Sequence, residues 1–76
     1  MPDVVLPIEK DPKATYVLNK WYKNVGDNIR RGDTLVSYEQ EKGTVDLVSE
    51  FDGVLREVYF KEGALVAPGS KICRIE

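Results

Sequence analysis

Two segments of this 76-residue chain repeat one another without a gap. The segment Val17–Glu39 can be written above Val54–Glu76 at an offset of 37 residues, over a length of 23 residues. Six positions of this alignment are identical, whereas unrelated segments of average composition would share roughly one or two. The identical pairs are Val17/Val54, Leu18/Leu55, Tyr22/Tyr59, Gly26/Gly63, Gly32/Gly69 and Glu39/Glu76. We therefore expect two equivalent halves, related by a pseudo-twofold axis, that bury one shared apolar face.

Each half has the pattern of strand, turn, very short strand, turn and strand. β-Branched and aromatic residues favour strands at Thr15–Tyr22 and Thr34–Glu39, and the equivalent strands of the second half are expected at Val54–Phe60 and Lys71–Ile75. The turns between them are predicted at Gly26-Asp27, Gly32-Asp33, Glu62-Gly63 and Pro68-Gly69. No segment combines a helical period with capping residues, so the chain is predicted to be all-β.

The start of the chain lies outside the repeat. Asp3–Leu6 has the composition of a strand, and Pro7–Ala14 is expected to be a surface loop because two prolines interrupt regular pairing. With 76 residues the chain is long enough for one small domain, which we expect to comprise residues 1–76.

A hairpin is predicted between the two halves, where Glu41-Lys42-Gly43 separates two strand-like runs. Three residues with glycine in the third place suit a type I turn followed by a bulge, with positive φ at Gly43 and Gln40 paired with Thr44. The side chain of Lys42 would then stand at the tip in water. Taken alone, an exposed lysine on a turn is ordinary surface charge, and it is the position of this hairpin in the whole chain that makes Lys42 a candidate site.

The composition excludes several classes of function. The net charge of −2 argues against a nucleic-acid partner, and no apolar run approaches the length of a membrane helix. The N-terminus lacks the pattern of a signal peptide, so we expect the cytoplasm, or the mitochondrial matrix in a eukaryote. The chain has no histidine, which removes the usual catalytic triads and most zinc sites. Cys73 is the only cysteine and is expected to be a buried, inert thiol. We therefore predict no catalytic residues and no metal site.

The chain resembles the biotinyl/lipoyl carrier domain family, and most of all the lipoyl domains of 2-oxoacid dehydrogenase acyltransferases. The family has Asp-Lys-Ala around its modified lysine, and this chain has Glu41-Lys42-Gly43. The likeness extends over nearly the whole chain. It includes Trp21 five residues before Gly26-Asp27, then Arg31-Gly32-Asp33-Thr34-Leu35, Tyr38-Glu39, Thr44-Val45-Asp46-Leu47, Asp52-Gly53-Val54-Leu55, Lys61-Glu62-Gly63 and Val66.

The resemblance implies a flattened barrel, or sandwich, of two four-stranded sheets. It also implies that Lys42 carries lipoic acid through an amide, with Glu41 and Gly43 as flanking recognition residues. The domain would be a carrier without catalytic residues of its own, presenting a swinging arm that moves acyl groups and electrons between active sites. The implied partners are a lipoyl ligase or transferase and the decarboxylase, acyltransferase and dihydrolipoamide dehydrogenase components of a 2-oxoacid dehydrogenase complex.

Three departures from the family pattern affect what can be carried over. Gly43 stands where lipoyl domains usually have Ala, and Glu50 stands where many have Pro. The Gly-rich loop that usually follows the first strand, and helps the decarboxylase recognise its domain, is replaced by Ile8–Lys13. The decarboxylase that would recognise this chain is therefore left open.

Two alternatives remain beside the lipoyl carrier. Biotinyl carriers of the family present Met-Lys-Met, and this chain has neither flanking methionine, since its only methionine is Met1. The second alternative is an unmodified structural or adaptor module of the same fold, in which Lys42 is plain surface charge. The carrier protein of glycine cleavage is a weaker alternative because that relative is longer.

Overall fold

A computed structural model describes residues 3–8 and 15–76 of the chain, and these residues form eight strands and no helix. The prediction of an all-β fold is therefore confirmed, with strand bounds within two residues of those expected. The strands are β1 Asp3–Val5, β2 Tyr16–Trp21, β3 Asn28–Ile29, β4 Thr34–Gln40, β5 Gly43–Val48, β6 Gly53–Val58, β7 Leu65–Val66 and β8 Lys71–Ile75. Because the described part contains no helix, none of it supplies a long apolar helix that could span a membrane.

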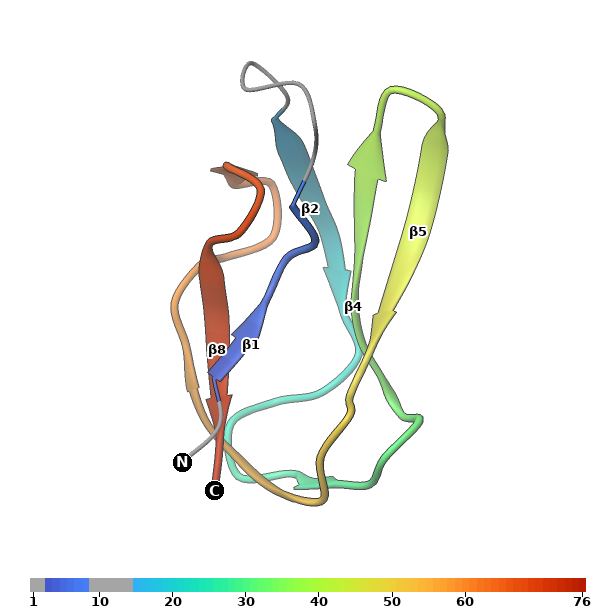
Figure 1. Cartoon of the computed structure of the whole chain (residues 1–76). Coiled ribbons are helices and arrows are strands. Elements are labelled where there is room, and N and C mark those ends of the chain that lie inside the picture. Colours follow the sequence, from blue (N-terminus) through green and yellow to red (C-terminus); the bar gives the residue numbers. More distant parts are fainter. Residues whose placement is uncertain (1–2, 9–14) are drawn as a thin grey trace.

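The strands form two four-stranded antiparallel sheets that face each other (Figure 1). One sheet has the order β1-β8-β6-β3 and the other has the order β5-β4-β2-β7. The short middle strands are exchanged, because β3 of the first half pairs with β6 and β7 of the second half pairs with β2. Each half thus completes the sheet of the other, which ties the two halves into one unit.

Equivalent strands have the same order and the same register, which confirms the predicted pseudo-twofold. Val17 lies opposite Glu39 in the first half. At the matching place in the second half, Val54 and Glu76 exchange backbone hydrogen bonds of 2.8 and 2.9 Å. The exchanged strands match as well, since Tyr16 pairs with Val66 and the equivalent residues Gly53 and Ile29 also pair.

The symmetry extends beyond the repeat that the sequence shows, because β1 and β5 are also equivalent. Val36 pairs with Leu47, and in the other sheet Cys73 pairs with Val4. The β4–β5 ladder skips one residue of β4 directly after Thr34. The β1–β8 ladder skips one residue of β8 at the equivalent place, directly after Lys71. The gap-free alignment of the two halves missed this match. In the chain, β5 directly follows β4, whereas β1 lies far ahead of β8, so the offset between β1 and β5 differs from the offset between the repeated segments.

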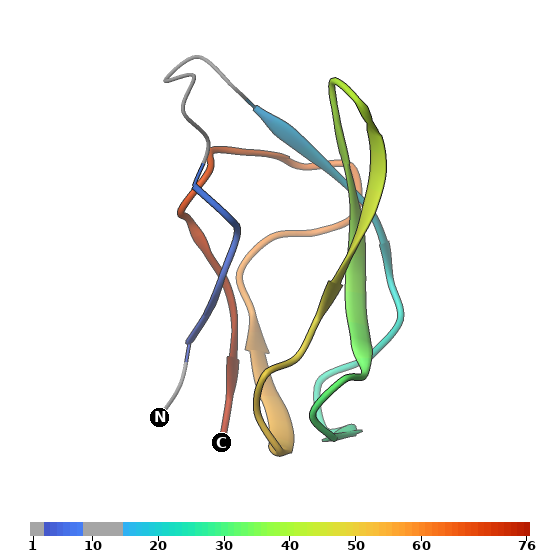
Figure 2. The same ribbon diagram turned by 45° about the vertical axis from the view of Figure 1, so that its right-hand side comes forward.

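The core is built from equivalent positions of both halves, and Figure 2 shows the space between the sheets where it lies. Leu18 and Leu55, for example, are both fully buried. The rings of Tyr16 and Tyr38 pack with centroids 4.8 Å apart. Full burial of one aliphatic side chain contributes about 1.5–3 kcal/mol. The buried apolar residues are Val4, Leu6, Tyr16, Leu18, Ile29, Leu35, Val36, Tyr38, Leu55, Val66, Ile72, Cys73 and Ile75.

Of the predicted loop Pro7–Ala14, the structure describes only Pro7 and Ile8, and both are exposed. The predicted turns of both halves are present. In the first half, aspartates fix the turns by accepting backbone hydrogen bonds. Asp27 accepts from the N–H of Asn24 at 2.7 Å, and Asp33 accepts from the N–H of Arg30 at 2.9 Å.

Asp33 makes the stability of the fold sensitive to acid. The backbone hydrogen bond from Arg30 favours the charged carboxylate and, with help from Lys23 at 3.6 Å, holds the pKa of Asp33 below its usual value of 3.8. A lowered pKa in the folded state gives stability that is present above the unfolded-state pKa. That stability is lost as the pH falls through the folded-state pKa.

We therefore expect Asp33→Asn to lower the free energy of unfolding at pH 7, and the gap to wild type to close as the pH falls below about 3.8. Urea titrations between pH 7 and pH 2.5 would measure this gap. Asp46→Asn is the matched control, because Asp46 is exposed and has no hydrogen bond or ion pair among the described residues. A gap for Asp33→Asn that stays constant across this range would contradict the assigned role of the carboxylate.

Candidate functional site: the lysine hairpin

The hairpin that carries Lys42 joins β4 to β5 through a loop of only two residues, Glu41 and Lys42. Gln40 pairs with Gly43, and Glu39 pairs with Thr44. The predicted three-residue loop, with a bulge and with Gln40 opposite Thr44, is therefore wrong. The bulge that does occur in this ribbon lies at its other end, near Thr34.

Gly43 explains the difference in loop length. Its φ of +132° confirms the predicted positive φ, but this value is far more extended than the left-handed region near +57° that a bulged turn needs. In this extended conformation Gly43 can face Gln40 directly and begin β5. Glu41 and Lys42 both have negative φ, as all described non-glycine residues do, so the turn is not of the mirror-image type that two-residue hairpins usually contain.

Gly43 should therefore tolerate side chains poorly for a backbone reason alone. A Cβ at this position would meet no atom within 4 Å, so crowding contributes nothing. We expect Gly43→Ala to cost about 1–2 kcal/mol of unfolding free energy, and Gly43→Val to cost more because a β-branched residue is a worse fit at positive φ.

Urea denaturation of both variants would measure these costs. Thr44→Val, one residue further along β5 at an exposed position, is the control and should stay within about 0.5 kcal/mol of wild type. A valine variant as stable as the alanine variant would contradict this account.

The base of the hairpin is anchored in the core. Tyr38 is 3% exposed, packs against Tyr16 and lies opposite Val45, which is packed against the core. Leu47, two residues further along, packs there as well. The ribbon is therefore held four residues before Lys42 and three residues after it, which leaves only the tip free.

The tip itself is open to water, as predicted for Lys42 and its neighbours. Glu41, Lys42 and Gly43 are all exposed, so the structure places the three predicted site residues together. Within residues 3–8 and 15–76, Lys42 makes no ion pair or hydrogen bond. The open space around Gly43 likewise leaves the tip uncrowded. An amine in this setting is available to another protein.

One contact near the tip was not anticipated from the sequence. Asn19 Nδ2 donates a hydrogen bond of 3.2 Å to Glu39 Oε1, and this bond crosses from β2 to β4. It steadies the Glu39 side chain three residues before Lys42. The repeat alignment matches Glu39 with Glu76 and carried no signal for its contact with Asn19.

The hairpin lies at one end of the molecule, whose long axis measures 33 Å. The start of β1 and the end of β8 lie together at the other end (Figure 1). The pseudo-twofold accounts for this arrangement, because the β4–β5 turn is the counterpart of the gap between the end of β8 and the start of β1. A linker joined to the N-terminus or to the C-terminus would therefore lie far from the lysine tip and would not obstruct it.

Chemistry other than presentation of an amine has little support in the described residues. They contain no group of three or more His, Cys, Asp or Glu side chains that could hold a metal ion. Cys73 is fully buried, as expected, and its burial raises the pKa of the thiol to about 12, so at neutral pH it is not a nucleophile. The arrangement therefore presents one lysine on a stiff ribbon.

The fold consists of two four-stranded sheets in which the two halves of the chain exchange their short middle strands, and it carries a lysine at an exposed hairpin tip. This combination defines a small carrier domain of the biotinyl or lipoyl class. The biotin/lipoyl family model, described as biotin-requiring enzyme, matches residues 9–75, so the chain belongs to this family. The predicted resemblance is thus confirmed.

Similar proteins narrow the class to lipoyl domains. The chain is 36% identical over 72 residues to the dihydrolipoyllysine-residue succinyltransferase component of the 2-oxoglutarate dehydrogenase complex of Staphylococcus saprophyticus. It is 36% identical over 55 residues to the dihydrolipoyllysine-residue acetyltransferase component of the acetoin cleaving system of Bacillus subtilis. These matches cover 95% and 72% of this chain, but only 17% and 14% of the two relatives.

A solved structure gives the same result. The solution structure of the lipoyl domain of the 2-oxoglutarate dehydrogenase complex from Azotobacter vinelandii superposes with a TM-score of 0.81 at 26% identity. The match covers 97% of this chain and 94% of that chain. The chain is a lipoyl domain, which is a carrier module rather than an enzyme, and the predicted fold of two four-stranded sheets is confirmed.

Proposed function

We propose that lipoic acid is attached to Nζ of Lys42 through an amide, and that the domain carries acyl groups and electrons between the active sites of a 2-oxoacid dehydrogenase complex. The observation that carries this proposal is that Lys42 stands at the tip of the core-anchored β4–β5 hairpin without a partner among the described residues. When bound, the dithiolane of the lipoyl group supplies the reversible disulfide and the thiol that accept electrons and acyl groups.

The residues present fit such a group. The Lys42 amine is exposed and no described side chain competes for it. The two-residue turn is narrow, and the space around Gly43 is open, so an enzyme pocket can take in the tip. Glu41 and Gly43, which flank the lysine, are the proposed recognition residues. No described side chain is hydrogen-bonded to the amine, so the role of deprotonating it falls to the ligase.

The rigid ribbon and the position of the chain ends explain how the domain would serve as a carrier. The anchored base of the hairpin keeps Lys42 pointing away from the barrel while the domain is tethered at its other end. A tethered arm is present at high effective concentration at every active site within its reach, so the transfer steps become faster without any new contact between the proteins.

The proposed partners follow from this role. They are a lipoyl ligase or transferase and the decarboxylase, acyltransferase and dihydrolipoamide dehydrogenase components of the complex. We propose the cytoplasm, or the mitochondrial matrix in a eukaryote, as the location, and residues 1–76 as one carrier domain. A biotinyl role fits less well because Glu41 and Gly43 stand where biotinyl carriers have methionine.

Intact mass after treatment with a ligase tests the proposal. The domain would be incubated with lipoyl ligase, ATP and lipoate, and separately with biotin ligase, ATP and biotin. We expect the mass of one lipoyl group in the first reaction and no change in the second. A biotin adduct without a lipoyl adduct would establish the biotinyl alternative, and no adduct on folded protein would establish an unmodified module.

A further inference from the structure

A groove of about 450 Å³ lies between the two open sheet edges on one side of the sandwich. Its walls are residues 3–8, from β1 and the chain after it, and residues 47–51, from the end of β5 and the chain after it. β1 is the edge of one sheet and β5 is the edge of the other. Because these strands are equivalent under the pseudo-twofold, the groove lies on the symmetry axis and is lined twice by equivalent backbone. The Lys42 tip is not part of it.

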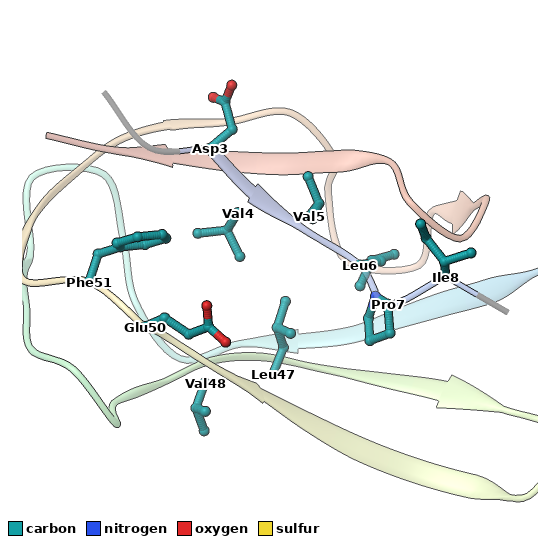
Figure 3. Close-up of a pocket in the computed structure, with 10 residues that line it drawn as sticks. All are labelled: Asp3, Val4, Val5, Leu6, Pro7, Ile8, Leu47, Val48, Glu50 and Phe51. Atoms are coloured by element: carbon teal, nitrogen blue, oxygen red, sulfur yellow. The ribbon is translucent and has the colours of Figure 1, made fainter.

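The interior of the groove is apolar. Val4, Leu47 and Phe51 point into the space between the two walls, as Figure 3 shows, whereas Val48 points away from it. Ile8, at one end of the groove, is 85% exposed, a large fraction for an isoleucine. The groove therefore offers an apolar surface that aliphatic side chains of a partner could contact.

One charged group breaks the apolar lining. The carboxylate of Glu50 lies between Val4 and Leu47 in Figure 3, although Glu50 is exposed to solvent. Glu50 makes no ion pair or hydrogen bond within the described residues. Asp3, the only other charged residue of the lining, points away and is paired with Lys71 at 3.3 Å.

The backbone around Glu50 is fixed rather than loose. The buried hydroxyl of Ser49 donates a hydrogen bond of 2.7 Å to the carbonyl of Phe51 and accepts one of 3.0 Å from the N–H of Phe51. This local turn holds Glu50 at its apex, so the side chain is directed to the groove by the backbone. Glu50 is also a residue at which the chain departs from lipoyl domains, many of which have proline there.

We propose that this groove binds an extended segment of a partner protein in which a lysine or arginine lies between aliphatic side chains. The lining has one carboxylate without a partner among the described residues, that of Glu50, and no basic residue, so its charge complements a cation. Among the strands that the structure describes, β1 and β5 have no partner on the groove side, and an extended segment can pair its backbone with such an edge while alternate side chains enter the groove. The groove, which does not include Lys42, takes this segment whether or not Lys42 is modified.

A peptide titration on the whole, unlipoylated chain tests the proposal. The probes are capped pentapeptides, Val-Ser-Lys-Ser-Val and its counterpart Val-Ser-Glu-Ser-Val, in which the first, third and fifth side chains share one face, and amide chemical shifts are followed by NMR at low ionic strength. We expect the lysine peptide to cause saturable shifts in residues 3–8 and 47–51, and the glutamate peptide to bind about tenfold more weakly. Glu50→Lys should reverse this preference.

Asp46→Lys is the matched control, because Asp46 is exposed on β5, outside the lining of the groove, and its substitution changes the net charge equally. It should leave the preference of the groove unchanged. The proposal would be overturned if the lysine peptide caused no shifts in the groove, or if Glu50→Lys and Asp46→Lys changed those shifts alike. Equal binding of butylammonium would also overturn it and would indicate a small-cation site. Concentration-dependent dimerisation with shifts in the groove would overturn it as well, in favour of a second copy of the chain.

Discussion

The Lys42→Arg variant is expected to fold like wild type and to gain no lipoyl group. Lys42 is exposed and makes no described ion pair, so its replacement should change the free energy of unfolding by no more than about 0.5 kcal/mol. Arginine keeps its charge but stays protonated, so it offers no amine nucleophile to the ligase. Intact mass after ligase treatment, together with thermal denaturation, would measure both parts of this result.

No other described lysine should take the place of Lys42. Lys23 and Lys71 are paired with Asp33 and Asp3, at 3.6 and 3.3 Å. Lys20 lies over the ring of Tyr22 at 5.2 Å on a strand of the sheet. Lys10 and Lys13 fall outside the described residues.

Lys61→Arg is the matched control, because Lys61 is also an exposed lysine next to a turn. This variant should be lipoylated as fully as wild type. A Lys42→Arg protein that still gains the mass of one lipoyl group would show that the attachment site lies elsewhere in the chain.

Much of the fold could be predicted because the two halves carry the same local signals. Matched glycines and strand residues gave the order of strands and turns in each half and the twofold relation between the halves. The exchange of β3 and β7 could not be predicted. Each of these strands has only two residues, so its partner is decided by tertiary packing and not by its own sequence.

The site was predicted in its position but not in its backbone detail. The sequence indicated that Gly43 takes positive φ, but glycine has access to both the left-handed and the extended part of that region, and only the extended value gives the two-residue loop. The groove beside Glu50 was missed for a different reason. It is formed by β1 and the segment after β5, which are far apart in the chain and are brought together only when both sheets are complete.

Gly53→Ala is expected to remove a large part of the stability of the domain. Gly53 begins β6 with a φ of +155°, and its backbone runs close to the end of β8. A Cβ here would lie 2.8 Å from Cγ2 of Ile75 and 2.9 Å from the carbonyl carbon of Glu76, and it would touch the Glu76 carbonyl oxygen. That oxygen accepts the 2.8 Å hydrogen bond from Val54, so the clash cannot be relieved without disturbing the strand pair.

The expected cost is about 2–5 kcal/mol, the sum of about 1–2 kcal/mol of backbone strain at positive φ and about 1–3 kcal/mol of overpacking. A domain of this size has a total stability of about 4–11 kcal/mol, so the variant should be largely unfolded at modest urea concentrations. Urea denaturation followed by tryptophan fluorescence would measure the loss, since Trp21 packs against the core and donates a hydrogen bond of 3.0 Å to the Phe60 carbonyl.

Gly63→Ala separates the two causes of that loss. Gly63 also has positive φ, at +88°, but a Cβ there would meet no atom within 4 Å, so only backbone strain of about 1–2 kcal/mol is expected. The difference between the two variants is therefore the contribution of the close approach between β6 and β8. If Gly53→Ala proves no more costly than Gly63→Ala, the ends of these strands are able to separate, and the tight packing at this end of the barrel is not needed for the fold.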